Sequence, residues 1–306
     1  MSIRFDGQAA IVTGAGRGLG REIATRLASR GAKVLVNDYG GDASTLKAGS
    51  PDIAEAVAQA IRDAGGEALA DATRVGTGES ATAIVDHAIA AFGRVDILVN
   101  NAGGAVVGNV DAFDDAAIEG VLQTNFLGPY MLMRRAWPHM RAQGYGRVVN
   151  ILSGAMFGLG QRAPYAAGKA GLMGLTAEAA LEGQGIGVFV NGACPVAYTR
   201  LAKGGPQEVA DWLKQHYPPA LAAEAIVFLC SRENQANGEI FDVGGGRVAR
   251  YAVFQNSGLY DGVLTCESLA ERFGEVRDLK DARPLNETKR DRPLPNAGLA
   301  DRGGKS

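Results

Sequence analysis

Short apolar segments alternate with helix-patterned segments along most of this chain, and this alternation restricts the fold more than any other feature. The apolar segments cover residues 8–13, 33–38, 67–71, 95–99, 147–152, 187–191 and 239–243. Strands separated by helices pair in parallel, and helices then cover both faces of the sheet. We therefore expect a Rossmann-type, doubly wound α/β sheet of about seven strands within residues 1–248.

Three stretches depart from the simple alternation. The longest predicted helix, residues 115–140, contains Pro138, which predicts a kink. Residues 194–219 lack a clear period and are expected to be irregular or only locally helical. Residues 249–282 form a predicted extension with one helix, 265–279, capped by Thr265. Residues 283–306 contain too few apolar side chains for a core, so we expect an irregular or subunit-crossing tail.

The composition excludes several classes of function. With 46% hydrophobic residues and a net charge of −2, nothing favours nucleic acid or an anionic membrane as partner. No apolar run approaches the roughly 20 residues that cross a bilayer. The first strand begins too close to Met1 for a signal peptide, so we expect a cytoplasmic protein. The three cysteines and three histidines are scattered, so we expect no metal site and interpret the cysteines as small buried side chains.

The first strand and the first helix are joined by a glycine-rich turn, Gly14-Ala15-Gly16-Arg17-Gly18-Leu19-Gly20. Glycines in this place let the backbone turn tightly and approach a dinucleotide pyrophosphate. Free amides and the helix dipole favour the anion there. The predicted cofactor contacts in this turn are Gly14, Arg17, Gly18, Leu19 and Gly20. A purely structural turn is the alternative interpretation, because a lone glycine motif is weakly specific.

The acidic residue after the second strand indicates which dinucleotide is bound. Asp38 lies 18 residues beyond Gly20, where a carboxylate can accept hydrogen bonds from both adenosine ribose hydroxyls and repel a 2′-phosphate. Arg17 favours NADP instead, but we expect the repulsion between Asp38 and a 2′-phosphate to outweigh the attraction of one arginine. NAD is therefore expected, with NADP as the alternative. Asp71 and Ala72, at the end of the third strand, are expected to meet the adenine edge, although Asp71 is also interpretable as a strand-end cap.

The chemistry is predicted from Tyr165 and Lys169. Residues four apart lie on one face of a helix. The Lys169 ammonium would favour the phenolate and lower the pKa of Tyr165, so that one group can both give and take a proton. Ser153 would place its hydroxyl at the carboxyl end of strand 147–152, where ligands bind in open α/β sheets. Taken alone, each residue has an ordinary alternative: a surface helix neighbour or a cap.

Five motifs in this order resemble the short-chain dehydrogenase/reductase family over about residues 5–248. They are the turn from Thr13 to Gly20, Asn100-Asn101-Ala102-Gly103, Asn125, Ser153 and Tyr165-x-x-x-Lys169. The resemblance implies an oxidoreductase that interconverts a secondary alcohol and a ketone with NAD. A narrower similarity, in residues 37–41 and 244–250, is to the branch that contains the dehydrogenase domain of the peroxisomal multifunctional enzyme and its stand-alone bacterial relatives.

The resemblance also implies roles for single residues. Tyr165 would be the general acid/base, and Ser153 would hold the substrate oxygen. Lys169 would lower the pKa of Tyr165 and bind the nicotinamide ribose, and Asn125 would hold a water that links the lysine to solvent. Further cofactor contacts would come from Asn101, Ala102, Gly103, Pro195 and Thr199. Val196 stands where the family has a glycine, which changes the backbone freedom at the nicotinamide rim. Family members usually form homodimers or homotetramers through the helices after the fourth and fifth strands.

The predicted substrate pocket is apolar. Its expected walls are residues 105–107, the stretch 154–160 and the segment 198–217, which is either a mobile lid or an ordinary crossover. The expected substrate is a hydroxyacyl-CoA, a hydroxysteroid or a cyclic or aromatic alcohol. Arg162 and Lys203 are either contacts to a CoA phosphate or solvated charges. Two other functions stay open: a sugar-nucleotide epimerase or dehydratase that uses the same Tyr/Lys pair, and a catalytically silent dinucleotide-binding regulator.

Overall fold

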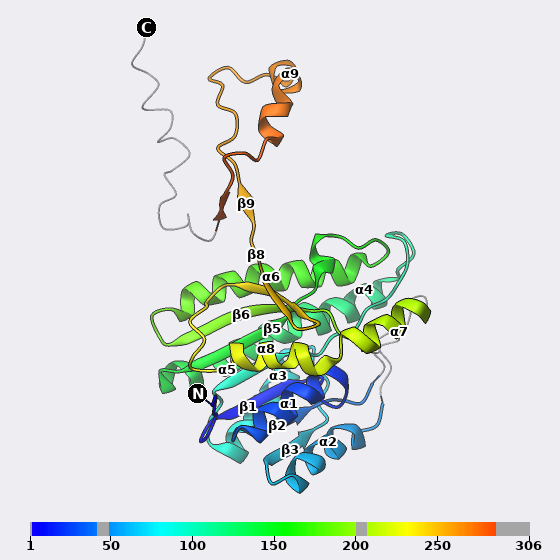
Figure 1. The fold of residues 1–306 in the computed structure, drawn as a ribbon, viewed down its shortest axis with the longest axis vertical. Helices are drawn as coiled ribbons and strands as arrows, with labels where there is room; N and C mark the ends of the chain where they lie inside the picture. The colour runs from blue at the N-terminus through cyan, green and yellow to red at the C-terminus, as the bar shows by residue number, and fades with distance from the viewer. Residues whose placement is uncertain (1, 42–48, 200–206, 286–306) are drawn as a thin grey trace. The chain divides into compact units, whose positions relative to one another are not determined.

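The computed structural model describes residues 2–41, 49–199 and 207–285. The chain forms two compact units, Met1–Arg250 and a second that begins at Tyr251. The strands of the first unit are β1 (Ala9–Thr13), β2 (Lys33–Asn37), β3 (Glu67–Asp71), β4 (Ile97–Asn100), β5 (Gly146–Ile151), β6 (Val188–Pro195), β7 (Ile240–Gly244) and β8 (Arg247–Tyr251). They form one sheet in the order β3-β2-β1-β4-β5-β6-β7-β8 (Figure 1). The order reverses between β1 and β4, which confirms the predicted doubly wound, Rossmann-type sheet.

Helices connect the parallel strands and cover both faces of the sheet. They are α1 (Gly18–Ser29), α2 (Asp52–Asp63), α3 (Gly78–Phe92), α4 (Asp115–Leu122), α5 (Gly128–Gln143), α6 (Ala163–Gly183), α7 (Gln207–His216) and α8 (Pro219–Leu229). One buried apolar layer contains side chains of α1, α2 and α8. A second layer contains side chains of α3, α5 and α6. The two layers lie on opposite sides of the sheet, as a doubly wound fold requires.

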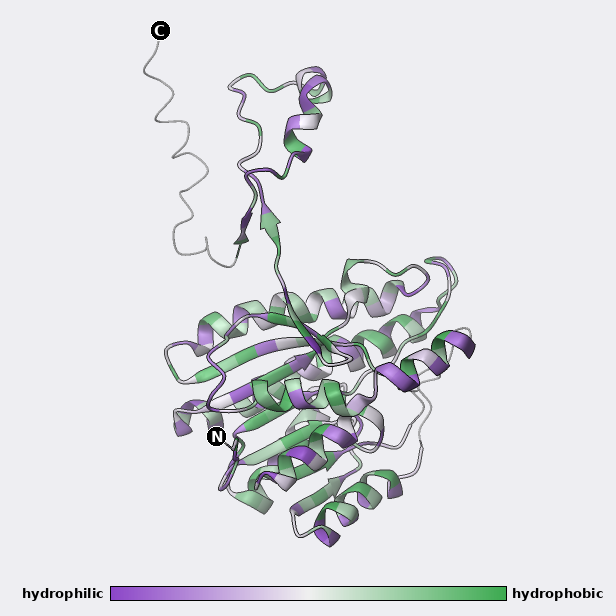
Figure 2. Cartoon of the chain, in the orientation of Figure 1, coloured by the Kyte–Doolittle hydropathy of each residue, from purple (hydrophilic) through white to green (hydrophobic). Residues whose placement is uncertain are grey.

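Each central strand contributes side chains to both layers. Ala10 and Val12 belong to the layer with α1, whereas Ile11, between them, belongs to the layer with α3. Successive side chains of a strand point to opposite faces, so a strand buried on both sides is mostly apolar. This is why the central strands are coloured mainly as hydrophobic in Figure 2, with polar stretches between.

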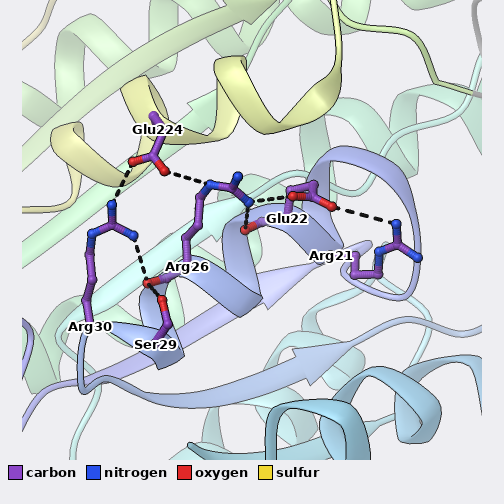
Figure 3. A network of polar contacts seen from close by, with 6 residues as sticks. All are labelled: Arg21, Glu22, Arg26, Ser29, Arg30 and Glu224. Carbon is purple, nitrogen blue, oxygen red and sulfur yellow. Dashed lines mark hydrogen bonds and ion pairs between the residues drawn. The ribbon is translucent and has the colours of Figure 1, made fainter. Parts of the chain in front are cut away.

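A network of charged side chains joins α1 to α8, two helices that are distant in sequence (Figure 3). Glu224 of α8 accepts hydrogen bonds from Arg26 Nε at 2.9 Å and from Arg30 Nη2 at 2.8 Å. Arg26 also pairs with Glu22, one helical turn away. Pairs that are this exposed contribute about 0–1 kcal/mol each. The network therefore aligns the two helices, while the buried layer beneath them supplies the stability.

The structure corrects the number of strands. The sheet has eight because Gly245 and Gly246, with φ of 56° and 79°, form a two-residue turn after β7. Such a turn needs positive φ at both positions and joins antiparallel strands. The chain therefore returns along β7 as β8, which adds a strand at this edge of the sheet.

Two further local predictions need correction, and a third is confirmed in part. The irregular point of the long helix is a π-helical segment, η1 (Gln123–Leu127), between α4 and α5, whereas Pro138 lies inside α5. In residues 194–219, which were expected to be irregular or only locally helical, α7 is such a local helix, and β6 continues to Pro195; residues 200–206 lie outside the described residues. Cys194 and Cys230 are buried as expected, but Cys266 is exposed.

The second unit is built around one helix and a short antiparallel pair. Strands β9 (Phe254–Gln255) and β10 (Arg283–Pro284) pair with each other. Helix α9 (Cys266–Arg277) begins at a capping box, in which the Thr265 side chain accepts from the Ser268 amide and Ser268 returns the bond. Residues 286–306 of the predicted tail lie outside the described residues.

Candidate active site

A cleft of about 400 Å³ opens where β1, β2, β4, β5 and β6 end. This is the edge at which ligands bind in doubly wound sheets, because the connections to the helices leave a crevice at the reversal of strand order. The cleft brings together these predicted site residues: Gly14, Arg17, Gly18, Leu19, Gly20, Asp38, Asn101, Ala102, Gly103, Ser153, Tyr165, Lys169, Pro195 and Thr199. Asn125, Asp71 and Ala72 are not part of its lining.

The glycine turn forms a cradle at the start of α1. Gly14 and Gly18 have φ of 63° and 51°, which glycine adopts without strain. A Cβ atom at Gly20 would lie 2.3 Å from the Gly14 carbonyl oxygen and 2.5 Å from the Asn101 amide nitrogen. Asn101 in turn donates to the Gly14 carbonyl at 3.0 Å and to the Thr13 carbonyl at 2.8 Å.

The start of α1 is suited to an anion. Arg17, the N-cap residue, makes no side-chain cap, and no acidic residue occupies the first turn of this described helix. The first amides of α1 and the positive end of its dipole therefore face the cradle. A dinucleotide pyrophosphate fits this arrangement of free amides and missing Cβ atoms.

Asp38 is held rigidly at the same end of the cleft. Its Oδ2 accepts from the Gly16 amide at 2.9 Å and its Oδ1 from the Gly40 amide at 2.8 Å. The side chain of Arg17 reaches the turn after β2, where Nη1 donates to the Gly41 carbonyl at 3.5 Å. Each carboxylate oxygen retains lone-pair capacity for a further donor. The carboxylate is thus oriented by the backbone before any ligand binds.

The carboxylate of Asp71 makes hydrogen bonds to residues beside the cleft. Its carboxylate accepts from Asn37 Nδ2 at 2.8 Å and from the Thr73 amide at 2.9 Å, and it pairs with His87 Nδ1 at 2.8 Å. Burial raises the pKa of Asp71, but these hydrogen bonds together hold it below its ordinary value. Ala72 is exposed. The predicted adenine contact of both residues stays a prediction, and the geometry gives Asp71 the role of a strand-end cap.

Helix α6, which carries Tyr165 and Lys169, is tied to the sheet by buried polar groups. Asn150 of β5 donates to Thr176 Oγ1 at 2.9 Å and accepts from Asn100 of β4 at 2.8 Å. Lys169 Nζ donates to the Ile151 carbonyl at 2.6 Å. The ammonium is fully buried, and this burial lowers the pKa of Lys169 to about 8. These hydrogen bonds therefore fix the position of α6 relative to the carboxyl end of β5.

Tyr165 lies between Lys169 and Ser153. The Lys169 Nζ is 5.6 Å from the centre of the phenol ring. Burial raises the pKa of Tyr165, and the hydrogen bond to Ser153 and the positive charge of Arg162 act against that rise. This differs from the prediction that Lys169 would lower this pKa. Lys169 remains an ammonium at neutral pH, but it directs Nζ at the Ile151 carbonyl. Ser153 and Arg162 are the groups that oppose the rise in the pKa of Tyr165.

The π-helical segment η1 places Asn125 behind the cleft. An extra residue in a helical turn reorients side chains and often occurs at functional sites. Asn125 Nδ2 donates to the carbonyls of Gly104 at 2.7 Å and Val121 at 2.9 Å. Its buried Oδ1 has no hydrogen-bond partner among the described residues. A Cβ atom at Gly103 would lie 2.9 Å from this Oδ1 and 3.7 Å from Lys169 Nζ, so both polar groups face the same glycine.

The opposite wall comes from the end of β6 and the residues that follow. Val196 donates its amide to the Val243 carbonyl at 2.9 Å. Its φ is not positive, since Gln161 is the one non-glycine with positive φ among the described residues. Valine therefore replaces the family glycine here without backbone strain. Thr199 faces Gly18, where a Cβ atom would lie 3.7 Å from the Thr199 methyl carbon.

The segment after β6 is closed at its base. Tyr198 donates its amide to the Tyr217 carbonyl at 2.9 Å. The Tyr217 ring packs against Gly245, where a Cβ atom would come within 2.8 Å of it. Leu213 of α7 lines the cleft. Lys203 and the rest of residues 200–206 lie outside the described residues, so the predicted lid and the predicted contact of Lys203 stay predictions.

Several cleft residues were missed in the sequence. They include Asn37, Tyr39, Thr73 and Thr124. A signal exists for the first three, because all lie within two residues of the end of β2 or β3, at the edge where ligands bind. Leu213 belongs to the segment 198–217, which was expected to form one wall of the pocket.

A model of the short chain dehydrogenase family matches residues 8–204. The chain belongs to this family. The short-chain dehydrogenases bind a nicotinamide dinucleotide and act on CH–OH groups, so this dehydrogenase is an oxidoreductase.

Relatives of the dehydrogenase include both free-standing and multidomain proteins. It is 40% identical to a short-chain type dehydrogenase/reductase of Mycobacterium tuberculosis, over 89% of this chain and 95% of the relative. It is 36% identical to cis-4-hydroxycyclohexanecarboxylate dehydrogenase of Sinomonas cyclohexanicum, over 81% of this chain and 100% of the relative. Peroxisomal multifunctional enzyme A of Dictyostelium discoideum is 34% identical over 90% of this chain, which spans 61% of that enzyme.

Solved structures give the same result. The full-length peroxisomal multifunctional enzyme type 2 of Drosophila melanogaster matches 98% of the dehydrogenase with a TM-score of 0.76 and 27% identity, over 49% of that longer chain. A metagenomic short-chain oxidoreductase in complex with NADP matches 76% of this chain and 95% of its own, with a TM-score of 0.64 and 31% identity. The predicted family and its branch are confirmed.

The described residues of the dehydrogenase lack two features. None of the described helices has the length and apolar character that crossing a bilayer requires. Within the same residues, no three His, Cys, Asp or Glu side chains gather as possible metal ligands.

Replacing Lys169 by Met should stabilise the dehydrogenase near neutral pH. The buried ammonium has a pKa of about 8, against 10.5 in the unfolded chain. Below pH 8 this difference opposes folding by about 3 kcal/mol. Loss of the hydrogen bond to the Ile151 carbonyl costs about 1 kcal/mol, so the free energy of unfolding should rise by about 2 kcal/mol in total.

The pH dependence separates this cause from simple repacking. Between the two pKa values the unfolded chain binds more protons than the folded dehydrogenase, so its stability rises with pH in this window. The methionine variant lacks this contribution. Urea unfolding across the window should therefore show the advantage of the variant shrinking as pH rises, and a constant difference would contradict the buried-ammonium explanation.

Proposed function

We propose that the dehydrogenase interconverts a secondary alcohol and a ketone on a largely hydrophobic substrate, with NAD as cofactor and Tyr165 as the acid/base. One observation carries this proposal: the hydroxyls of Tyr165 and Ser153 lie in the same cleft as the glycine cradle. Alcohol oxidation needs a group that moves a proton beside a dinucleotide that moves a hydride. The cleft contains both the proposed proton-transfer group and the proposed dinucleotide site.

In the proposed mechanism, Tyr165 accepts the proton of the substrate hydroxyl during oxidation and returns it during reduction. Ser153, which lines the same cleft, holds the same substrate oxygen. The Lys169 ammonium and Arg162 place positive charge near the phenolate that forms, which favours it. Asn125 Oδ1 and Lys169 Nζ, facing Gly103 together, offer a polar path for the proton toward solvent. The cofactor, when bound, supplies the hydride acceptor.

The preference for NAD is proposed from Asp38. The two backbone amides fix its carboxylate where it lines the cleft, so it can accept from ribose hydroxyls and repel a 2′-phosphate. Replacing Asp38 by Ala should therefore shift the ratio of kcat/KM for NADP over NAD upward by about 10–100-fold, since hydrogen bonds to a charged group contribute about 1.5–3 kcal/mol. Arg17 would then face the 2′-phosphate without opposition.

Steady-state kinetics with both cofactors measures this shift. Asp86→Ala removes an exposed carboxylate that pairs with Arg135 on α5, and it is the matched control. An unchanged NADP/NAD ratio in Asp38→Ala would mean that another group selects the cofactor. A wild-type preference for NADP would overturn the NAD proposal outright.

An apolar substrate is proposed from the walls of the cleft near Tyr165. Leu152, Ala105 and Leu213 line it there, and Asp38, at the far end, is the one carboxylate among the described lining residues. The exposed side chains of Val107 and Leu159 extend this character to the neighbouring loops. Burying such surface against a substrate contributes about 25 cal/mol for each Å². Hydroxyacyl-CoA esters, hydroxysteroids and cyclic or aromatic alcohols fit these walls.

The test is a spectrophotometric screen for reduced cofactor with NAD, and separately with NADP, against those three classes of alcohol. Turnover of one class with NAD supports the proposal and identifies the substrate family. Calorimetric binding of NAD without turnover of any class would favour a silent dinucleotide-binding protein. Release of a dehydrated or epimerised sugar nucleotide would favour the other enzyme class.

We further propose a homodimer or homotetramer formed through α5 and α6. The exposed side chains of Tyr130 and Leu181 lie on these helices, next to a hollow of about 280 Å³ lined by Trp137 and Leu175. Light scattering behind a sizing column tests this, and a monomer at micromolar concentration would contradict it. A cytoplasmic location stays a prediction.

A further inference from the structure

Arg162 lies at the entrance to α6, three residues before Tyr165. It is the N-cap residue of that helix, and its carbonyl accepts the Ala166 amide at 2.9 Å. Its half-buried side chain lines the same cleft as Tyr165 and Ser153. The start of α6 therefore contributes the partly shielded side chain of Arg162 to the lining of this cleft.

The backbone that carries Arg162 is held under strain. The preceding residue, Gln161, has φ of 56°, and no other described non-glycine residue has positive φ. Its carbonyl accepts the Gly108 amide at 2.9 Å, which joins the loop after β4 to the loop after β5. Strained residues of this kind persist where their surroundings fix them, and they cluster at ligand sites. The position of Arg162 is therefore set by two loops at once.

The other charged groups of the cleft have partners. Lys169 donates to the Ile151 carbonyl, Arg17 to the Gly41 carbonyl, and Asp38 accepts two backbone amides. The side chain of Arg162 has no hydrogen bond or ion pair with any described residue. Its positive charge nevertheless opposes the rise in the pKa of Tyr165. A half-buried guanidinium beside apolar walls, without a carboxylate near it, is complementary to an anion brought by a ligand.

We propose that Arg162 binds an anionic group of the substrate, a carboxylate or a phosphate, while Tyr165 acts on the hydroxyl. This rests on the proposed function and narrows its substrate class from a hydrophobic alcohol to a hydrophobic hydroxy acid or an anionic ester. A planar guanidinium makes two parallel hydrogen bonds to such a group, which also fixes the orientation of the substrate. The relative from Sinomonas cyclohexanicum is named for a substrate with both a ring hydroxyl and a carboxylate.

The test measures binding, so it needs no turnover. The probes are cyclohexanecarboxylate and its neutral isostere cyclohexanecarboxamide, titrated calorimetrically into the dehydrogenase saturated with NADH. Wild type should bind the carboxylate about 10–100-fold more tightly than the amide, as expected for hydrogen bonds to a charged group. Arg162→Gln should abolish this preference and leave amide binding and NADH binding unchanged. Arg162→Lys should restore part of it. Arg135→Gln, on the exposed face of α5, is the matched control and should keep it.

A second arm distinguishes the two sources of negative charge. It compares a hydroxyacyl-CoA with the same acyl group on N-acetylcysteamine, which lacks the phosphates. Loss of affinity in Arg162→Gln for the CoA ester alone would assign the guanidinium to a phosphate. Equal affinity of wild type for all charged and neutral pairs would overturn the proposal, as would an equal loss for all of them in Arg162→Gln. Selective anion binding without turnover of any hydroxy compound would instead overturn the proposed function and leave the role of Arg162 intact.

Discussion

Replacing Tyr165 by Phe is expected to lower kcat by about 10²–10⁴-fold, the range that general acid/base catalysis contributes. The substitution removes one oxygen and keeps the ring, which is buried in a small cluster with Ala105, Val121 and Ala155. Stability should therefore change little. Binding of NAD should also persist, because the cradle from Gly14 to Gly20 lies at the other end of the cleft.

Stopped-flow and steady-state kinetics with the best alcohol measure the effect, and calorimetry measures NAD affinity. Tyr130→Phe is the matched control, because Tyr130 lies on α5 outside the cleft and is 43% exposed. Undiminished turnover by Tyr165→Phe would remove the phenol from the mechanism. The pH profile adds a second readout, since burial raises the pKa of this phenol and Ser153 and Arg162 oppose the rise.

Replacing Gly20 by Ala is expected to weaken NAD binding by about 10–100-fold and to destabilise the fold by about 1–3 kcal/mol. The new Cβ would lie 2.3 Å from the Gly14 carbonyl oxygen and 2.9 Å from the Ala15 Cα, both backbone atoms that cannot move independently. It would also press on Asn101, whose amide holds the turn. The turn must therefore open, and the cradle opens with it.

Calorimetric titration with NAD and urea unfolding separate the two effects. Gly274→Ala is the matched control, because Gly274 lies inside α9 with open space around its Cα. Alanine in a helix interior stabilises by about 0.5–1 kcal/mol relative to glycine. Unchanged NAD affinity in Gly20→Ala would show that the turn tolerates a side chain and that the dinucleotide binds elsewhere.

The fold was predictable because its signals are local and repeated. Seven apolar segments mark seven strands, and β3, Glu67–Asp71, has the predicted bounds. The eighth strand depends on two consecutive positive φ angles, at Gly245 and Gly246. The sequence shows glycines there but does not show which of the conformations open to glycine they adopt.

The candidate site was predictable to the extent that motifs mark strand ends. Asp38, Asn101 and Ser153 lie in the cleft because each follows a strand. The partners of Asp71 and the isolation of Arg162 were not predictable, because they depend on which side chains meet across loops. The cause of the Tyr165 pKa shift was missed for a related reason. Spacing places Lys169 near Tyr165 but does not show how deeply the ammonium is buried.

The hydrogen bond between the Tyr198 amide and the Tyr217 carbonyl joins the two ends of the segment between these residues. The two ends of this segment meet at one point, and each doubling of the length of a loop costs only about 0.6 kcal/mol. Leu213, within the segment, lines the cleft. Under the proposed function, a graft from a relative that replaces residues 200–216 and keeps Thr199 is therefore expected to change substrate preference while the cofactor cradle stays as it is.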